Sequence, residues 1–385
     1  MSGYLLLHYD EFHTPLGLVS PLLTGDGPRV VLHVRVDDAD DGGAAPAEGW
    51  VREHVDARDE FAAGYLTRAV KANAVYEGGY YLSAALSRPL LAAVCARSLR
   101  ERGIGVLVHG FAGNDQLRFE MAVQALAPET TIVSVASLLG SQNDRNGDGY
   151  TVSTNLWGRS VEAGPLADPA TRPPAEVFER AGAGFATDVP AALHTVSFER
   201  GVPVAFDGVA SGLPDLLRRV EAAARPHGFG YTDLVEDGAI ALKTRAVYES
   251  PAAIVLVAAH RDLERLVATR AQNRFKALVD QAWAELVYDG YWFDAQRESL
   301  DAYVDSVNRW VTGDVDLLFR PGGVHVVGRR SPHGLYGEAE SIYRFGQDFG
   351  AREATAVASS LSAHMRASVR RGATARENGN PRWNA

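Results

Sequence analysis

The sequence predicts an α/β protein in which a parallel-sheet domain is followed by an α+β domain and a C-terminal helix. In residues 1–142, short apolar runs alternate with helical patterns, as in strands joined by right-handed helical crossovers. After residue 142 the apolar runs alternate with polar residues, which is typical of antiparallel strands. A chain of 385 residues is also too long for one ordinary core. We therefore expect domains at 1–142 and 143–345 and a helix with a tail at 346–385.

In the first domain we expect three buried strands and two helices. The apolar runs at 4–7, 30–36 and 106–109 are typical of buried strands, and the patterns at 62–74 and 89–102 of helices. Ligands of parallel sheets bind beyond the carboxyl ends of the strands. The loops after these three strands are therefore where a site is expected.

In the second domain a turn cluster at 143–150 precedes alternating strands at 194–198 and 315–319. Long helical patterns follow at 261–286 and 294–311. The second presents an apolar face made of Leu300, Val304, Val307 and Trp310. A last helix is expected at 351–371, with Val357, Leu361 and Met365 spaced four apart. It could pack on its own domain or serve as an oligomerisation arm.

Composition excludes several classes of protein. The residues are 46% hydrophobic and 22% charged, as in globular domains, and no apolar run of eighteen residues or signal-like start is visible. The single cysteine, Cys95, permits no internal disulfide and is expected to be a buried helical residue in a reducing, cytoplasmic protein. A net charge of −10 disfavours nucleic acid as a partner.

Sequence blocks in a fixed order then carry a resemblance. They are VYEGGYYLSAALSRPL (75–90), HGFAGNDQLRFE (109–120), TNLWGRSVEAGPLADP (154–169), LVED…KTRAVYESPA (234–252), AELVYDGYWF (284–293) and VVGRRSPHGLY (326–336). Together they resemble argininosuccinate synthase over most of the chain. The resemblance implies a Rossmann-like, adenine-nucleotide-α-hydrolase-like domain, a synthetase and oligomerisation-type domain, and a homotetramer or homodimer.

The resemblance also implies a reaction. That family activates the ureido oxygen of citrulline with ATP, and the amine of aspartate then displaces AMP. Such a site must grip a zwitterionic amino acid, position a second amine and neutralise a triphosphate. The expected partners are small amino acids, citrulline-like and aspartate-like, with ATP as the co-substrate and neither nucleic acid nor membrane.

Candidate site residues follow by resemblance. The positions that correspond to citrulline contacts are Tyr80, Asn114, Arg118, Thr151, Ser160, Glu236 and Tyr248. Arg118 can clamp a carboxylate, and Glu236 can hold an ammonium. Asn114 and Asp115 would hold the aspartate-like substrate, and Asp115 and Arg118 are the expected catalytic pair. The simpler alternative is that Asn114 caps a helix on which Asp115 and Arg118 pair. Ala85 and Thr151 depart from serines of the family.

The nucleotide loops depart further. The stretch LLLHYDEFHTPLG has no Gly-Gly turn, and Asp10 and Glu11 stand where residues that welcome an anion belong. The second loop keeps Gly110 and Gly113, the candidate nucleotide contacts, but lacks a threonine, a glycine and a lysine. We therefore expect an altered or lost phosphate site.

Other patterns indicate no site. His8, Asp10, Glu11 and His13 fit no metal signature, and DRNGDG (144–149) lacks the twelfth-position glutamate of a calcium loop, so no metal is expected. Three functions stay open at this point. They are a C–N ligase with an altered ATP site, a catalytically dead homologue that binds an amino acid, and an ATP-independent enzyme acting on a related amino acid.

Overall fold

The computed structural model describes residues 3–9, 16–38, 48–135, 149–181, 188–336 and 350–377. Its contacts divide the chain into two compact units, Met1–His333 and Gly334–Ala385. Both domains that we expect before residue 345 fall almost entirely in the first unit, and the boundary at residue 142 stays a prediction. In the described residues, no helix is long and apolar enough to cross a membrane.

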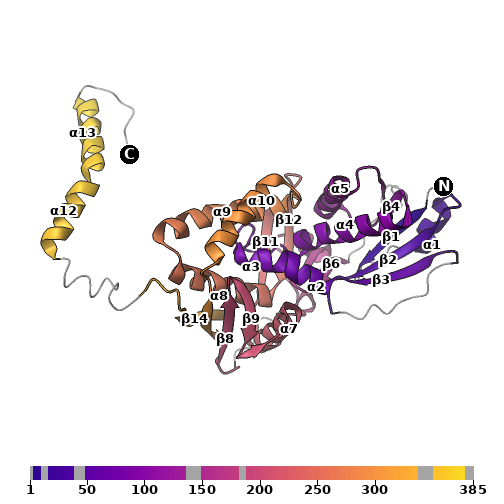
Figure 1. Ribbon diagram of the computed structural model, residues 1–385, viewed down its shortest axis with the longest axis horizontal. Helices are drawn as coiled ribbons and strands as arrows, with labels where there is room; N and C mark the ends of the chain where they lie inside the picture. The colour runs from indigo at the N-terminus through magenta and orange to yellow at the C-terminus, as the bar shows by residue number, and fades with distance from the viewer. Residues whose placement is uncertain are drawn as a thin grey trace. The chain divides into compact units, whose positions relative to one another are not determined.

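A five-stranded parallel sheet forms the N-terminal part of the first unit (Figure 1). Its order is β3 (Val51–Asp56), β2 (Arg29–Arg35), β1 (Tyr4–Tyr9), β4 (Val106–His109) and β5 (Thr131–Ser134). The three predicted strands are confirmed as the central ones. The edge strands β3 and β5 escape prediction because they are half exposed and carry polar residues, whereas central parallel strands are almost wholly apolar.

The sheet is buried on both faces. Leu5 and Leu7 belong to the large core that also contains residues of α4 (Ser83–Arg102) and α5 (Gly113–Leu126). Leu6, between them in sequence, packs on the other side with Val19 of α1 (Leu16–Val19) and with Trp50. Side chains alternate between the faces of a strand, so one apolar run serves two cores.

The predicted helices of this domain differ from the observed ones at their ends. The pattern at 62–74 lies in a continuous helical run of α2 (Arg58–Phe61), the π-helical η2 (Ala62–Leu66) and α3 (Thr67–Lys71). Helix α4 begins at Ser83, earlier than the predicted start at Pro89. The Tyr80 hydroxyl explains the earlier start, because it accepts the backbone N–H groups of Ala84 and Ala85 at 2.9 and 3.1 Å. Cys95 is buried within α4, as predicted.

Two antiparallel sheets follow in the chain, as the alternating pattern predicts. One has the order β11 (Tyr231–Asp237), β12 (Lys243–Glu249), β7 (Gly158–Ala163) and β6 (Tyr150–Asn155). The other has the order β10 (Val209–Ala210), β9 (Val202–Phe206), β8 (Ala192–Glu199), β13 (Gly313–Arg320) and β14 (Gly323–Arg330). The strands predicted at 194–198 and 315–319 are β8 and β13. The remaining short helical turns are η1 (Ser20–Leu22), η4 (Gly164–Ala167), η5 (Ala175–Val177) and η6 (Arg225–His227).

The helix predicted at 261–286 is two helices, α8 (Pro251–Val267) and α9 (Arg270–Tyr288). Thr269 separates them: its side chain accepts from the backbone of Gln272, whose own side chain accepts from the backbone of Thr269. Helix α10 (Ala295–Asn308) starts at the capping residue Asp294. Trp310 was predicted on its apolar face but lies beyond its end and is 51% exposed.

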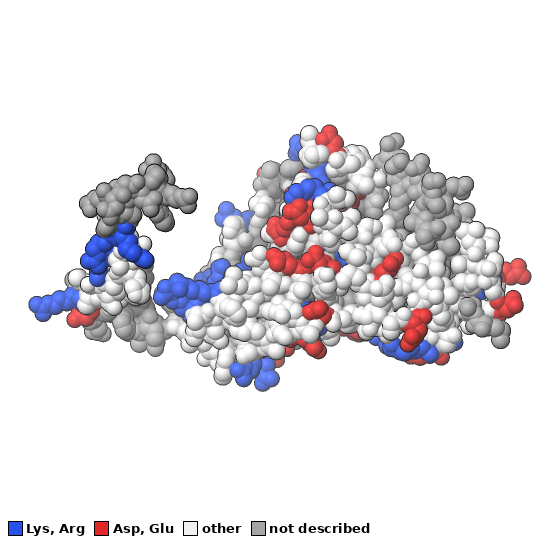
Figure 2. Space-filling view, turned by 90° about the horizontal axis from the view of Figure 1, so that it is seen from above, with Lys and Arg blue, Asp and Glu red and all other residues white. Residues whose placement is uncertain are grey.

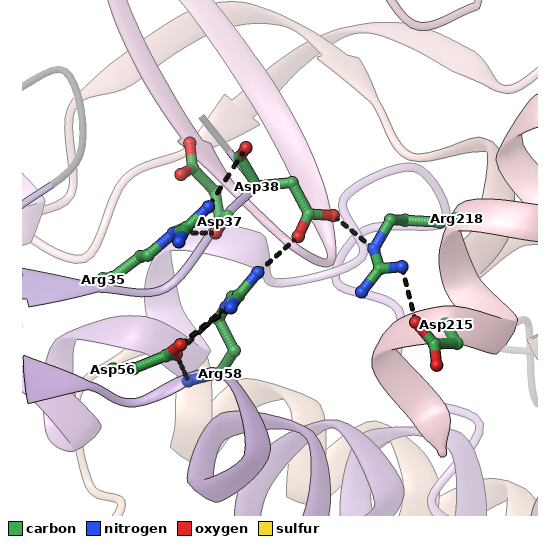
Figure 3. A network of polar contacts seen from close by, with 7 residues as sticks. All are labelled: Arg35, Asp37, Asp38, Asp56, Arg58, Asp215 and Arg218. Carbon is green, nitrogen blue, oxygen red and sulfur yellow. Dashed lines mark hydrogen bonds and ion pairs between the residues drawn. The ribbon is translucent and has the colours of Figure 1, made fainter. Parts of the chain in front are cut away.

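An ion-pair network links the parallel sheet to α7 (Leu213–Ala224), the helix that packs on β9 and α8 (Figure 3). Arg58 donates to Asp56, the last residue of β3, and to Asp38, which follows β2. Arg218 of α7 contacts Asp38 at 2.8 Å and Asp215 at 2.5 Å. Asp38 therefore bridges two arginines from segments 160 residues apart in the chain (58 and 218).

The second unit contains α12 (Ala351–Leu361) and α13 (Ala363–Glu377), so the helix predicted at 351–371 is interrupted at Ser362. On the face shown in Figure 2, acidic and basic side chains of the described residues are interspersed over the larger unit. That face is one of mixed charge and not a uniformly basic one.

Candidate functional site

A cavity of about 360 Å³ lies where the first turns of α4 and α5 meet the sheet β11-β12-β7-β6. Every predicted site residue lines it. These are Tyr80, Gly110, Gly113, Asn114, Asp115, Arg118, Thr151, Ser160, Glu236 and Tyr248. The fold therefore brings residues that are up to 168 positions apart (80 and 248) to one cavity, while the role of each stays a prediction.

Asp115 lies in the first turn of α5, between two arginines. Its Oδ2 accepts from Arg88 Nη2 at 2.7 Å, and its Oδ1 accepts from Arg118 Nη1 at 3.0 Å. Burial acts to raise the pKa of this carboxyl, but the two guanidinium groups outweigh it and hold the pKa below its usual value. Asp115 is therefore a carboxylate that stays ionised.

Arg118 uses its Nε and Nη1 atoms for hydrogen bonds inside the protein. Its Nε donates to the Tyr288 carbonyl, and its guanidinium lies 4.4 Å from the centre of the Tyr288 ring. Its Nη2 is buried without a partner among the described residues. Gly290 allows this close packing, because a Cβ there would lie 3.1 Å from the Cα of Arg118 and its φ is +89°. Of the nitrogens expected to clamp a carboxylate, Nη1 is thus shared with Asp115 and Nη2 is the one without a partner among the described residues.

The prediction that Asn114 caps α5 is wrong. Ala112 occupies the N-cap position, and Asn114 is the second helical residue. The backbone turns at Gly113, whose φ of +58° favours glycine. The Oδ1 atom of Asn114 is buried and has no partner within the described residues. An unsatisfied buried amide that lines a cavity is a group available to a ligand.

An acidic and aromatic wall faces α5. Tyr288 donates its hydroxyl to Glu236 Oε1 at 2.7 Å, and burial raises the pKa of Glu236. Tyr80 stacks on Tyr248 with ring centres 4.2 Å apart, and burial raises the pKa of Tyr80 to about 12. These tyrosines remain neutral hydrogen-bonding groups over the physiological pH range.

The sheet supplies a row of polar side chains by simple alternation. Thr151 and Ser153 of β6 and Ser160 and Glu162 of β7 all line the cavity. Register pairs Ser153 with Ser160 and Thr151 with Glu162. Because side chains two apart share a strand face, Ser160 at the site implies Glu162 there as well.

Sequence reasoning missed Arg88, Ser153 and Glu162 as residues of this site. Arg88 is 1% exposed, and its guanidinium contacts the rings of Tyr9 and Phe111, with 4.9 and 4.7 Å to the ring centres. Its signal was a lone arginine in the otherwise apolar run AALSRPLLAAVC. The signal for the other two was the two-residue spacing from Thr151 and Ser160.

The side of the cavity that is predicted to contact nucleotide is described in part. Gly110, Ala112 and Gly113 line it, and Phe111 packs 5.2 Å from the ring of Tyr9. His8 lies at the end of β1 and is buried, whereas Asp10, Glu11 and His13 lie outside the described residues, as does most of DRNGDG. Where side chains are described, no group of three or more metal-binding residues is placed together.

Comparison with known proteins covers both domains. The family model for the "Arginosuccinate synthase N-terminal HUP domain" matches residues 43–145, and that for the C-terminal domain matches 150–367. An argininosuccinate synthase of Dehalococcoides mccartyi is 39% identical over 76% of this chain and 77% of its own length. Those of Pyrococcus furiosus and Rubrobacter xylanophilus are 38% and 40% identical over 75% of this chain, and over 74% and 75% of their own lengths.

Proposed function

This chain belongs to the argininosuccinate synthase family of C–N ligases, and from that premise we propose that it joins an activated citrulline-like amino acid to an amine such as that of aspartate. The cluster of Arg88, Asp115 and Arg118 carries the proposal. It presents an ionised carboxylate to an ammonium and, beside it, an unpartnered guanidinium nitrogen to a carboxylate. Glu236 offers a second acid for an amino-acid ammonium across the cavity.

We further propose that ATP serves as the activating co-substrate with altered phosphate contacts. The segment LLLHYDEFHTPLG lies before residue 43, where the match to the N-terminal family model begins. The loop at 109–115 contains no lysine. Cationic groups of the described cavity that could meet phosphate oxygens are Arg88 at its base and Lys243 on β12. These observations support an altered site and leave the family reaction chemically possible.

Two other functions predict different behaviour. A catalytically dead homologue would bind a citrulline-like amino acid and neither consume ATP nor form product. An ATP-independent enzyme would transform the amino acid without releasing pyrophosphate. Asp10 and Glu11, acidic residues in place of an anion-binding turn, favour these alternatives over the ligase.

The test combines calorimetry with product analysis. ATP, citrulline and aspartate are titrated singly and together, and AMP, pyrophosphate and argininosuccinate are then quantified. The ligase requires equimolar AMP, pyrophosphate and product. Asp115→Asn is expected to lower kcat/KM for aspartate by about 30- to 150-fold, since a buried charged contact is worth about 2–3 kcal/mol. Asp215→Asn, in the exposed network of Figure 3, is the matched control. Amino-acid binding without nucleotide consumption would overturn the ligase.

A further inference from the structure

Glu162 differs from the other acids of the cavity because its carboxylate is not engaged. It lies on β7, lines the cavity, and makes no hydrogen bond or ion pair with any described residue. Both oxygens of Asp115 are taken by arginines. Oε1 of Glu236 accepts the hydroxyl of Tyr288, while its Oε2 is buried without a partner among the described residues. Glu162 is therefore, within the described part of the chain, an acid without a partner that lines the same cavity as Asp115, the residue expected to hold the amine, and it is available to accept a proton.

We propose that Glu162 is the proton acceptor that frees the amine of the second substrate for C–N bond formation. This role rests on the proposed ligase function. The ammonium of the aspartate-like substrate gives one proton to a Glu162 oxygen, and the nitrogen lone pair forms the bond to the activated ureido carbon. The bond from that carbon to the adenylate oxygen breaks, and its electron pair leaves with AMP. The second amine proton leaves with the phosphate oxygen, and the product keeps one N–H on the new bond.

Asp115 is poorly suited to this role, although it is the acid expected to hold the ammonium. Two guanidinium groups stabilise its charge and lower its pKa, so its conjugate acid would form only at a large cost. Glu162 has the opposite surroundings. Burial, and then the neighbouring Asp115 and Glu236 carboxylates, raise its pKa to about 7. A base with a pKa near the working pH both accepts and returns a proton efficiently.

The charged and titratable groups around Glu162 come from every element that lines the cavity beside it. They are Arg88 of α4, Asp115 and Arg118 of α5, Glu236 of β11, and Lys243 and Tyr248 of β12. Arg118 and Arg88 lower the pKa of Glu162, but by less than burial and the two carboxylates raise it. A third carboxylate near two others is the one most easily protonated.

The experiment separates the two halves of the reaction in the full-length protein. Pyrophosphate release in a single turnover without aspartate reports activation of the ureido group. Product formation with aspartate reports attack by the amine. For Glu162→Gln we expect pyrophosphate release within about threefold of wild type and product formation slower by about 10²–10⁴-fold, the usual contribution of a general base. Glu162→Asp should recover part of that loss, and the rise of the wild-type rate through pH ~7 should vanish in Glu162→Gln.

Glu298→Gln is the matched control, since it removes the same charge from an exposed position of α10. A Glu162→Gln enzyme that forms product at the wild-type rate would overturn the role of Glu162. So would one that loses pyrophosphate release and product equally, because that result indicates a damaged pocket. Failure of the ligase itself is seen separately, as absence of product from the wild-type enzyme, and it would overturn both proposals before any variant is compared.

Discussion

Among the described residues that line the cavity, Arg88, Arg118 and Lys243 carry positive charge, and Asp115, Glu162 and Glu236 carry acids. The charges balance formally, but they are not shared evenly. Asp115 takes a hydrogen bond from each of the two arginines, and Lys243 pairs outside the cavity with Asp237. Glu162 and Glu236 are the cavity acids that have no cationic partner among the described residues, and burial raises the pKa of both.

This distribution makes a prediction about stability at the position of Glu162. Its pKa of about 7 in the folded chain exceeds the ordinary value of 4.5, so the unfolded chain ionises first as the pH rises. The favourable contribution of the protonated acid is present below pH ~4.5 and is lost as the pH rises through ~7. Glu162→Gln should therefore match wild type at pH 4.5 and be more stable at pH 8, by about 1–3 kcal/mol. Urea unfolding at both pH values measures this difference. An equal difference at both pH values would contradict it, and Glu298→Gln should show no such pH dependence.

At the scale of elements, the break between α8 and α9 depends on a few hydrogen bonds. Thr269 and Gln272 exchange bonds with each other's backbone, and together they cap the first turn of α9. Thr269→Ala should lower the free energy of unfolding by about 1 kcal/mol, the usual cost of losing an N-cap. Thr269→Ser keeps the hydroxyl and should stay close to wild type. Urea unfolding of both variants checks this, and similar losses in the two would show that the capping bonds do not stabilise the break.

How far the elements could be predicted depends on where each lies. The central strands β1, β2 and β4 are largely buried and predominantly apolar, so the sequence identifies them. Edge strands share no such pattern. The break at Thr269 has a visible capping-box sequence, but the apolar helical pattern on both sides conceals it. The start of α4 could not be predicted because a tyrosine hydroxyl, not a standard cap, satisfies its first N–H groups.

For the site, the resemblance located ten residues that the fold does bring to one cavity. The resemblance did not identify Arg88, whose involvement depends on packing that only the folded chain shows, or Glu162, for which the two-residue spacing from Ser160 on β7 was the signal. Arg88 reaches the cavity from an otherwise largely apolar helix and contacts two rings, Tyr9 at the end of β1 and Phe111 in the loop after β4. The single free nitrogen of Arg118 likewise follows from a carbonyl 170 positions along the chain, at Tyr288. Neither fact is encoded in local sequence.

At the scale of the whole molecule, the Gly334–Ala385 unit presents apolar side chains to solvent. Those on α12 and α13 recur every four residues and are between 45% and 76% exposed: Val357, Leu361, Met365 and Val369. An apolar stripe of this kind on a helix usually lies in an interface. It fits the predicted homodimer or homotetramer, in which the stripe would be covered by other copies of the chain.

The double substitution Leu361→Lys with Met365→Lys should therefore lower the molar mass in solution, because it places charge in the middle of the stripe. Size-exclusion chromatography with light scattering measures the mass of the full-length chain. A matched pair, Leu193→Lys with Val209→Lys, replaces exposed apolar residues of the first unit and should leave the mass unchanged. An unaltered mass for the first pair would contradict an interface at this stripe.

The hydroxyl of Tyr80 has a consequence for which ligand atoms the cavity accepts. A phenol oxygen can receive two hydrogen bonds and give one, and both receiving positions are occupied by the N–H groups of Ala84 and Ala85. The backbone of α4 therefore fixes the role of this hydroxyl: toward the cavity it can only donate a hydrogen bond. The ligand atom that meets Tyr80 has to be an oxygen with a free lone pair, such as that of a carboxylate or a ureido group. An ammonium group placed there would face a donor with a donor, so for the amino acid that we propose as the ligand the first turn of a helix would favour one orientation.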